Sequence, residues 1–391
     1  MKIVVGGVGL VSALGSGVDA NVAAMREGRS GITLSPSILR TGNTIPVGEF
    51  ALTNAEMHRR LNIPTECHLS RTALLGILAV REAMNDAKIP QGLRVGLVSA
   101  TSVGGMDQTE GFFRAFMTDE SSGRLRDVRM HDCGASTEAI VRYCGIDGYR
   151  TTISTACSSA ANAIMMGAKL IRHGIADCVV AGGTDALSAF TLNGFKSLMI
   201  LDEKPCRPFD ESRAGLNLGE GAGYVVLMHE EDATNPYCIL EGYANRNDAY
   251  HQTASSADGN GAYLAMSDAL AMAGIEPSRI DYVNVHGTGT LNNDASEGAA
   301  MQRLFGKDIP PFSSTKGFTG HTLAAAGGIE AVFSSLAVRY GMLFPNINFR
   351  TPIAQSGLVP VSEFTEGKDI KCVLSNSFGF GGNCSSLVFA K

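Results

Sequence analysis

The stretch TTISTACSSAANAIMMGAKLIRHG, residues Thr151–Gly174, decides how this chain folds. Its first residues are β-branched or small, which suits a short buried strand. From Ser158 onward the sequence is rich in Ala, Met and Leu, with its apolar residues on one helical face. Gly174 stands where a helix C-cap is expected. Cys157 is therefore predicted to lie on the turn between a strand and the first turn of a helix.

This position suits a reactive cysteine. Unpaired backbone amides and the positive end of the helix dipole point at a side chain placed there. Such surroundings lower a thiol's pKa and favour the thiolate, which is the nucleophilic form. The neighbours Ala156, Ser158 and Ser159 are small and leave room for a substrate. A buried structural thiol is the alternative interpretation, and we favour the nucleophile.

Two later stretches each carry a histidine among small residues. VNVHGTGT surrounds His286 and follows a predicted strand, where the sites of α/β proteins gather. SSTKGFTGH contains His321, five residues after Lys316. A neutral imidazole that donates its N–H, beside a lysine ammonium, would stabilise negative charge on a carbonyl oxygen. Cys157 with these two histidines is the predicted catalytic group.

Composition excludes several other classes of protein. The 391 residues are 45% hydrophobic and 18% charged, with a net charge of −6 and no Lys/Arg block, so nucleic-acid binding is not expected. The nine cysteines include no C-x-x-C pair, which argues against a zinc site or a thioredoxin-like motif. No run approaches the roughly 20 apolar residues that span a bilayer. We expect a cytoplasmic protein with no metal and no membrane segment.

Alternating strand and helix patterns predict an α/β fold with a mostly parallel sheet. Asn235–Pro236 suggests a division into an N-terminal half with the nucleophile, 1–236, and a C-terminal half with the histidines, 237–391. The glycine-rich segment after the strand predicted at 2–5 is interpreted as a tight turn, because it lacks the last glycine of a dinucleotide fingerprint. Residues 32–66 are expected to be an irregular surface excursion.

Four motifs occur together in a specific order: TACSSA, HGTGT, KGFTGH followed by LAAAGGIEA, and GFGG. In that order and approximate spacing they resemble the β-ketoacyl-acyl-carrier-protein synthases, most closely the type II elongating enzymes of the synthase I/II class. VVGGVGLVSALGSG near the start and FDESRAGLNLGEGAG at Phe209–Gly223 also resemble this family. The resemblance covers essentially the whole chain. It implies a thiolase-like fold of five layers, α-β-α-β-α, built from two pseudo-repeated halves and working as a dimer.

The resemblance also implies a role for individual residues. Cys157 would accept the acyl group, and His286 and His321 would promote decarboxylation of a malonyl thioester and steady the enolate. Lys316 would balance charge, with Glu330 as the buried acid behind the site. Phe380 would be the gate, its backbone N–H joining that of Cys157 in an oxyanion hole. The residues implied to contact substrate are Thr288 and Thr290 on the phosphopantetheine arm, Val103 on the acyl tunnel, and Phe195.

The implied partners are an acyl carrier protein, which brings the phosphopantetheine, and a second subunit, identical or related. No other cofactor is implied. The candidates for docking the acidic carrier are the basic residues Arg59, Arg60, Arg71 and Lys196.

The sequence departs from the family at Asn383–Cys384, where Thr-Asn or His-Asn usually follows GFGG, and at Gly317, where Ser is usual. These departures fit a synthase of polyketide or polyene-like lipid biosynthesis.

Two other functions are less well supported. A chain-length-determining partner subunit typically lacks the nucleophile, which is present here as Cys157. A synthase III-type starter enzyme uses Cys-His-Asn, and His321 argues against it. A non-decarboxylating thiolase is a further alternative. The acyl chain length stays open.

Overall fold

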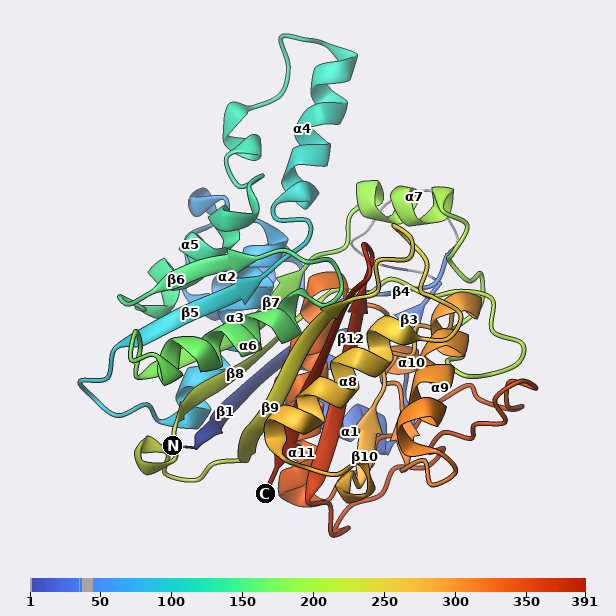
Figure 1. Ribbon diagram of the computed structural model, residues 1–391. Coiled ribbons are helices and arrows are strands. Elements are labelled where there is room, and N and C mark those ends of the chain that lie inside the picture. The colour runs from blue at the N-terminus through green and yellow to red at the C-terminus, as the bar shows by residue number, and fades with distance from the viewer. Residues whose placement is uncertain (1, 35, 37–44) are drawn as a thin grey trace.

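The computed structural model describes residues 2–34, 36 and 45–391. Its strands form two halves of five, joined in one large sheet (Figure 1). The N-terminal half contains β1 (Ile3–Ser12), β5 (Val95–Ala100), β6 (Arg150–Ile153), β7 (Cys178–Asp185) and β8 (Gly221–His229). The C-terminal half contains β9 (Cys238–Asn247), β10 (Tyr282–Asn284), β11 (Phe312–Ser313), β12 (Cys372–Gly379) and β13 (Asn383–Ala390).

The two halves repeat one topology. Their spatial orders are β6-β5-β7-β8-β1 and β11-β10-β12-β13-β9, so in each half the order is third, second, fourth, fifth and first strand. The halves meet where β1 pairs with β9 through Val4–Ile239 and Val5–Cys238. The predicted pseudo-repeat is therefore confirmed at the level of topology, although the two halves share no evident residue pattern.

Helices complete the five predicted layers. Between the half-sheets lie α6 (Ser159–Arg172) and α11 (Ala326–Tyr340), which contact strands of both halves. The outer layer of the N-terminal half holds α3 (Arg71–Ala87) and α5 (Cys133–Cys144). The opposite outer layer holds α8 (Asn260–Ala273) and α9 (Leu291–Phe305). Among the described residues, no helix is long and apolar enough to cross a bilayer.

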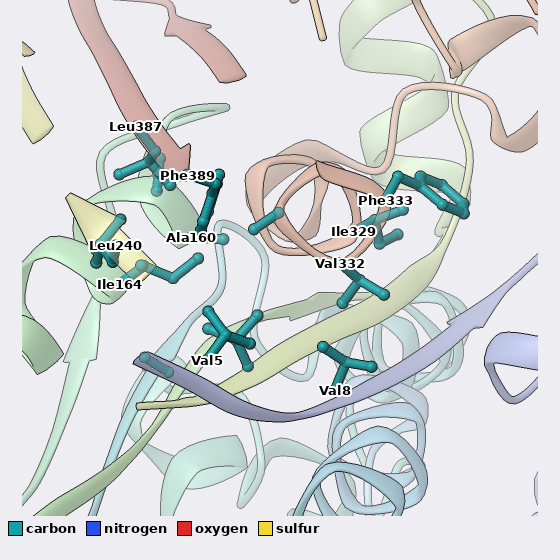
Figure 2. Packing of buried hydrophobic residues seen from close by; sticks show 14 of the residues in the cluster. Val5, Val8, Ala160, Ile164, Leu240, Ile329, Val332, Phe333, Leu387 and Phe389 are labelled. Atoms are coloured by element: carbon teal, nitrogen blue, oxygen red, sulfur yellow. The ribbon is translucent and has the colours of Figure 1, made fainter. Parts of the chain in front are cut away.

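The largest buried apolar cluster fills this middle layer. Figure 2 shows Val5 and Val8 of β1 facing Val332 and Ile329 of α11, and Ile164 of α6 near Leu240. These residues alternate along strands or recur with helical spacing, so each element buries one face here. Within this cluster α6 packs against α11. The Cys157 turn precedes α6 and the His321 segment precedes α11, so this packing brings the two segments together.

Smaller elements connect the layers. They are the helices α1 (Val18–Arg26), α2 (Asn54–Leu61), α4 (Met106–Thr118), α7 (Ala189–Ser197) and α10 (Lys316–Thr319), the short strands β2 (Gly15–Ser16), β3 (Ile32–Thr33) and β4 (Val47–Gly48), and five one-turn 3₁₀ segments. The expectation of an irregular excursion over 32–66 was wrong at α2, which a Thr53/Glu56 capping box starts. Part of that excursion, 35 and 37–44, lies outside the described residues.

The expected glycine-rich turn after residue 5 was wrong, because β1 continues through it to Ser12. The glycines are there for packing. A Cβ on Gly9 would lie 2.0 Å from the Ala79 carbonyl oxygen of α3, and one on Gly7 would lie 2.5 Å from that of Ala83. Glycine in a strand commonly marks such a close approach of another backbone.

The prediction of a mostly parallel sheet was also wrong. Only the pairs β5–β6, β5–β7, β10–β11 and β10–β12 are parallel among the described strands. The central strands run antiparallel, because β8 returns beside β7 and β13 returns beside β12 in the opposite direction.

Helix α4 projects from the body of the molecule together with the segment that follows it (Figure 1). It exposes the side chains of Phe113 and Met117, and the following turn exposes that of Leu125, which is 80% exposed. Exposed apolar side chains grouped in this way mark an interaction surface.

Candidate active site

Cys157 lies on the turn between β6 and α6, as predicted. The turn is tight, since Ala156 adopts a left-handed conformation with φ of 53°. The Thr155 amide donates to Ser159 Oγ at 2.7 Å, and Ser159 Oγ donates to the Ala156 carbonyl at 2.5 Å. Serines that close the turn in this way hold a conformation that L-residues otherwise avoid.

The prediction of a lowered thiol pKa was wrong. Burial raises the pKa of the Cys157 thiol to about 12, and the nearby Asp185 carboxylate adds to this. The Lys316 charge and the backbone amides of Phe380 and of Cys157 itself favour the thiolate, but they offset burial only in part. The sulfur is therefore a protonated thiol at rest, and a thiolate formed there is held by two amides from separate parts of the chain.

One cavity of about 230 Å³ brings the predicted catalytic residues together. Cys157, His286, His321 and Phe380 all line it. The predicted substrate residues Phe195, Thr288 and Thr290 line it as well.

His321 is held as a hydrogen-bond donor. It precedes α11, and its Nδ1 accepts the Leu323 amide at 3.1 Å. Burial and the Lys316 charge lower the pKa of His321 well below its usual value, so the ring is neutral. With Nδ1 occupied as an acceptor, the proton of the neutral ring is on Nε2.

His286 has the same tautomer for a different reason. The Lys316 ammonium lies 3.4 Å from its Nδ1 and donates to its carbonyl oxygen at 2.5 Å. An ammonium has no lone pair, so Nδ1 is the acceptor and Nε2 carries the proton. Burial, then Lys316 and His321, lower the pKa of His286 well below its usual value. The two imidazole rings stand nearly perpendicular with centroids 5.3 Å apart.

Lys316 and Glu330 form a buried ion pair behind the histidines. The Lys316 ammonium donates to Glu330 Oε1, and both side chains are 2% exposed. Ser377 Oγ lies 3.5 Å from Glu330 Oε2, while burial raises the pKa of Glu330. The three protons of Lys316 thus have three acceptors, two of them on His286, which the sequence motif alone did not indicate.

Sequence reasoning missed Glu297, which positions the His286 loop. Its Oε1 accepts the His286 amide at 2.9 Å and its Oε2 accepts the Gly287 amide at 2.8 Å. Asn376 donates to the same carboxylate at 3.1 Å, while burial raises the pKa of Glu297 to about 7. An acid 11 residues after the histidine, on a buried face of the next helix, was the available signal.

The residues predicted to form the gate and to contact the phosphopantetheine arm have specific neighbours. The rings of Phe195 and Phe380 stack with centroids 5.9 Å apart at the cavity. Thr288 Oγ1 and Thr290 Oγ1 lie 2.9 Å apart, and Thr290 Oγ1 also accepts the Asn293 amide at 3.3 Å as the N-cap of α9. A ligand that contacts Thr290 therefore meets a hydroxyl already engaged with the backbone.

Val103 is not among the described residues that line the cavity. It packs with Phe195, which lines the cavity, against an apolar cluster that contains Leu187 and Leu323. Its turn is held by Asp185, another residue that the sequence did not indicate. Asp185 accepts the Thr101 hydroxyl at 2.5 Å, the Val103 amide at 3.3 Å and the Ala324 amide at 2.8 Å.

Arg71 was a wrong candidate for carrier docking. Its guanidinium is buried, where it pairs with Glu220 at 2.6 Å and donates to the Phe50 and Leu52 carbonyls. Arg59 and Arg60 are exposed on α2, and Lys196 is exposed on α7. Arg124 and Arg126, on the projecting segment after α4, are exposed cations that the sequence analysis did not single out.

A resident metal ion finds no ready ligand set in the described ranges 2–34, 36 and 45–391. No three His, Cys, Asp or Glu side chains come together there in a group that could hold one.

Comparisons with known proteins agree with this geometry. The N-terminal domain model of β-ketoacyl synthase matches residues 1–233, and the C-terminal domain model matches residues 237–350. A 3-oxoacyl-[acyl-carrier-protein] synthase 2 of Staphylococcus aureus is 33% identical over 410 residues, covering 100% of this chain and 98% of the relative.

Two solved structures are similar over the whole chain. The ishigamide ketosynthase/chain length factor has a TM-score of 0.93 at 29% identity, covering 100% of this chain and 99% of that one. A type II polyketide synthase acyl-carrier protein in complex with its ketosynthase has a TM-score of 0.89 at 27% identity, with the same coverage. Full-length matches in sequence and in fold, over a cavity that holds a cysteine and two histidines, show that this chain belongs to the β-ketoacyl synthase family.

Proposed function

We propose that the protein joins an acyl thioester to malonyl-acyl-carrier protein by decarboxylative Claisen condensation, with Cys157 as the acyl acceptor. The observation that carries this proposal is the shared cavity, where the cysteine faces two histidines whose Nε2–H groups are both donors. A nucleophile beside two neutral N–H donors suits a reaction that passes through an acyl-enzyme and an enolate.

In the first half-reaction the Cys157 sulfur attacks the carbonyl of the incoming acyl thioester. A new C–S bond to Cys157 forms, the C–S bond to the phosphopantetheine breaks, and the proton lost from the Cys157 thiol ends on the departing thiol. The tetrahedral oxyanion would be stabilised by the amides of Cys157 and Phe380, which already donate towards the sulfur. Burial raises the pKa of the resting thiol and so disfavours the thiolate, whereas the two amides favour it. The attack therefore depends strongly on those two amides.

In the second half-reaction the malonyl thioester loses CO₂. The electron pair of the broken C–C bond moves into an enolate, whose oxygen would accept from the Nε2–H of His286 and of His321. The enolate carbon then attacks the acyl-Cys157 carbonyl, a C–C bond forms, and the C–S bond to Cys157 breaks. The proton that the thiolate needs is taken up from solvent as the site resets.

This chemistry needs no cofactor beyond the phosphopantetheine on the carrier, which arrives with the substrate. The reaction is redox-neutral, since the departing CO₂ leaves its electron pair to the new bond. Burial, and after it the Lys316 charge, lower the pKa of both histidines and keep the rings neutral, while Glu330 pairs with that charge. A protonated imidazole would donate its proton to the enolate, which would then no longer attack the acyl-Cys157 carbonyl.

Carrier-protein docking is supported by the complex of a carrier with its ketosynthase among the solved structures. In this chain, exposed cations lie at three places that an acidic carrier could contact: α2 with Arg59 and Arg60, α7 with Lys196, and the α4 segment with Arg124 and Arg126. Lys196 adjoins Phe195, which lines the cavity.

A two-subunit assembly is supported by two features. Strand β6 is the end of the sheet path, so one of its edges has no partner strand among the described residues. The projecting α4 segment exposes apolar side chains. The solved ketosynthase/chain length factor supports, as the alternative to a homodimer, a heterodimer with a related subunit. Such pairing would direct the product to a polyketide or polyene chain.

Intact-protein mass spectrometry after incubation with carrier-bound acyl thioesters of several lengths tests the proposal. The protein should gain the mass of one acyl group, and Cys157→Ala should abolish the gain. Cys384→Ala is the matched control, because Cys384 is a second buried thiol that lines the same cavity. An acyl adduct retained by Cys157→Ala, or lost from Cys384→Ala alone, would contradict the assignment.

A further inference from the structure

The two amides that face the Cys157 sulfur belong to separate chain segments. One is on the turn before α6, and the other is on the hairpin between β12 and β13. Gly379 pairs with Asn383 at the end of that hairpin, so Phe380, Gly381 and Gly382 form its three-residue loop. An oxyanion site built from two segments works only while the segments are held at a fixed separation.

The outer side of the hairpin loop is fastened away from Cys157. The Gly381 amide donates to the Gln252 carbonyl at 2.7 Å, and the Asp248 amide donates to the Gly382 carbonyl at 2.8 Å. Asn247 Nδ2 donates to the Gly381 carbonyl at 3.0 Å. These bonds hold the loop to the segment after β9, and they do not relate it to the nucleophile.

The inner side is fastened through the side chain of Asn383. Its Oδ1 accepts the hydroxyl of Ser158, the residue next to Cys157, at 2.6 Å. The same oxygen accepts Asn162 Nδ2 of α6 at 2.9 Å and Asn245 Nδ2 of β9 at 2.7 Å. One amide oxygen thus joins the hairpin, the nucleophile turn and the neighbouring strand.

The nucleophile turn depends on such ties. Ala156 holds a left-handed conformation, which an alanine seldom adopts because its Cβ comes too close to a backbone carbonyl oxygen. Asn162 also donates to Thr155 Oγ1 at 2.8 Å, so the Asn383 cluster reaches both sides of Ala156. In addition, a Cβ on Gly379 would lie 3.1 Å from the Cys157 amide nitrogen, which shows how closely the hairpin packs on the turn.

We infer that Asn383 is a positioning residue for acyl transfer: its side-chain oxygen ties the Phe380 hairpin to the Cys157 turn and so sets the separation of the two oxyanion amides. The inference rests on the proposed function. Asn383 is one of the positions at which this chain departs from the usual family pattern, and sequence reasoning gave it no role.

The two half-reactions use different hydrogen-bond donors. Acyl transfer to Cys157 uses the two amides, whereas malonyl decarboxylation uses the two histidines. The histidine rings are held by the Leu323 amide and by Lys316, and neither contacts Asn383. Loss of the tie should therefore slow acyl loading and spare decarboxylation, whereas a general loosening of the fold would slow both.

The test measures both rates in three variants. Asn383→Ala should lower acyl loading about tenfold to a hundredfold, less than the 10²–10³ that follows outright removal of an oxyanion donor. Decarboxylation of malonyl-carrier thioester should stay within about threefold of the parent, by the same reasoning that the histidine donors are intact. Ser385→Ala is the matched control, because Ser385 bonds Asn162 and Asn245 but neither Ser158 nor the hairpin loop. It should load at the parental rate.

Ser158→Ala removes the same bond from the other side and serves if Asn383→Ala does not fold. The two variants share the loss of the Ser158–Asn383 bond, so the loss of loading in the double variant should be smaller than the product of the two single losses. Equal losses of loading and decarboxylation, a loss in Ser385→Ala as large as in Asn383→Ala, or multiplicative effects would overturn the inference. A parent protein that loads no acyl group would instead refute the proposed function.

Discussion

Lys316 contacts His286 twice, donating to its carbonyl oxygen at 2.5 Å and lying 3.4 Å from its Nδ1. One ammonium thereby fixes the place of the loop and the tautomer of the ring. The same ammonium is paired with Glu330 in the interior. Charge balance and histidine orientation are therefore functions of one side chain, and they can be separated by substitution.

Lys316→Met should lower the free energy of unfolding by about 3–5 kcal/mol, because it leaves the Glu330 carboxylate buried without its partner. Adding Glu330→Gln should recover most of that loss. Malonyl decarboxylation should stay about 10²-fold below the parent in the double variant, since His286 Nδ1 has lost its donor. Urea unfolding and CO₂ release are the measurements. If the double variant recovers both the free energy of unfolding and the rate of decarboxylation, Lys316 acts on stability alone.

His321→Ala should retain acyl transfer to Cys157 and lose malonyl decarboxylation by about 10²–10³ in rate, as expected when a fixed donor to the enolate oxygen is removed. The two half-reactions are followed by intact mass and by CO₂ release. Leu323→Ala, which keeps the amide that orients His321, is the control. Equal loss of both half-reactions in His321→Ala would indicate a collapsed site.

The raised pKa of Cys157 predicts a pH profile for its reactivity. Because the thiol's pKa is about 12, the thiolate fraction should increase about tenfold per pH unit throughout the range from 7 to 10. The rate of iodoacetamide alkylation at Cys157, followed by peptide mass spectrometry, should increase in parallel without a plateau. A plateau near pH 8 would mean that the helix terminus outweighs burial.

Dimerisation should involve strand β6. Its unpaired edge is predicted to join the same strand of a second subunit across a two-fold axis, in line with the family resemblance. Thr152→Pro should weaken association, because proline removes a backbone donor from the strand and cannot continue a ladder. Sedimentation at micromolar concentration gives the mass. A parent protein that sediments as a single subunit would contradict the prediction.

Val103→Phe should shift preference toward short acyl chains. Val103 and Phe195 pack against the same apolar cluster, so a larger ring at position 103 would crowd the cavity wall to which Phe195 contributes. One methylene in an apolar pocket is worth about 1–3 kcal/mol of discrimination, so the variant should prefer shorter chains without rejecting long ones completely. Loading rates of short and long acyl thioesters should separate. If both fall equally, or neither changes, the acyl chain does not pass this residue.

Local chemistry in the sequence was enough for much of the site. The strand-to-helix turn at Cys157 and the two histidines, one after a strand and one before a helix, follow from patterns in the neighbouring residues. Those patterns are read from side-chain periodicity and from glycine placement, which act on the nearby backbone. The four motifs also carried the family resemblance, because their order is itself a property of the sequence.

Tertiary contacts decided the rest. From the sequence alone, the glycines of β1 predict a turn. In the structure they lie within the strand, where α3, some 70 residues further along the chain, packs closely on them. The sequence predicts Arg71 as a surface cation for carrier docking, but its guanidinium is buried in an ion pair with Glu220. The pKa of Cys157 depends on how much protein covers the sulfur and on Asp185 and Lys316, which lie far away in the chain. Burial and electrostatic surroundings are sums over residues that only the folded chain brings together, whereas strand, helix and motif are local properties of the sequence.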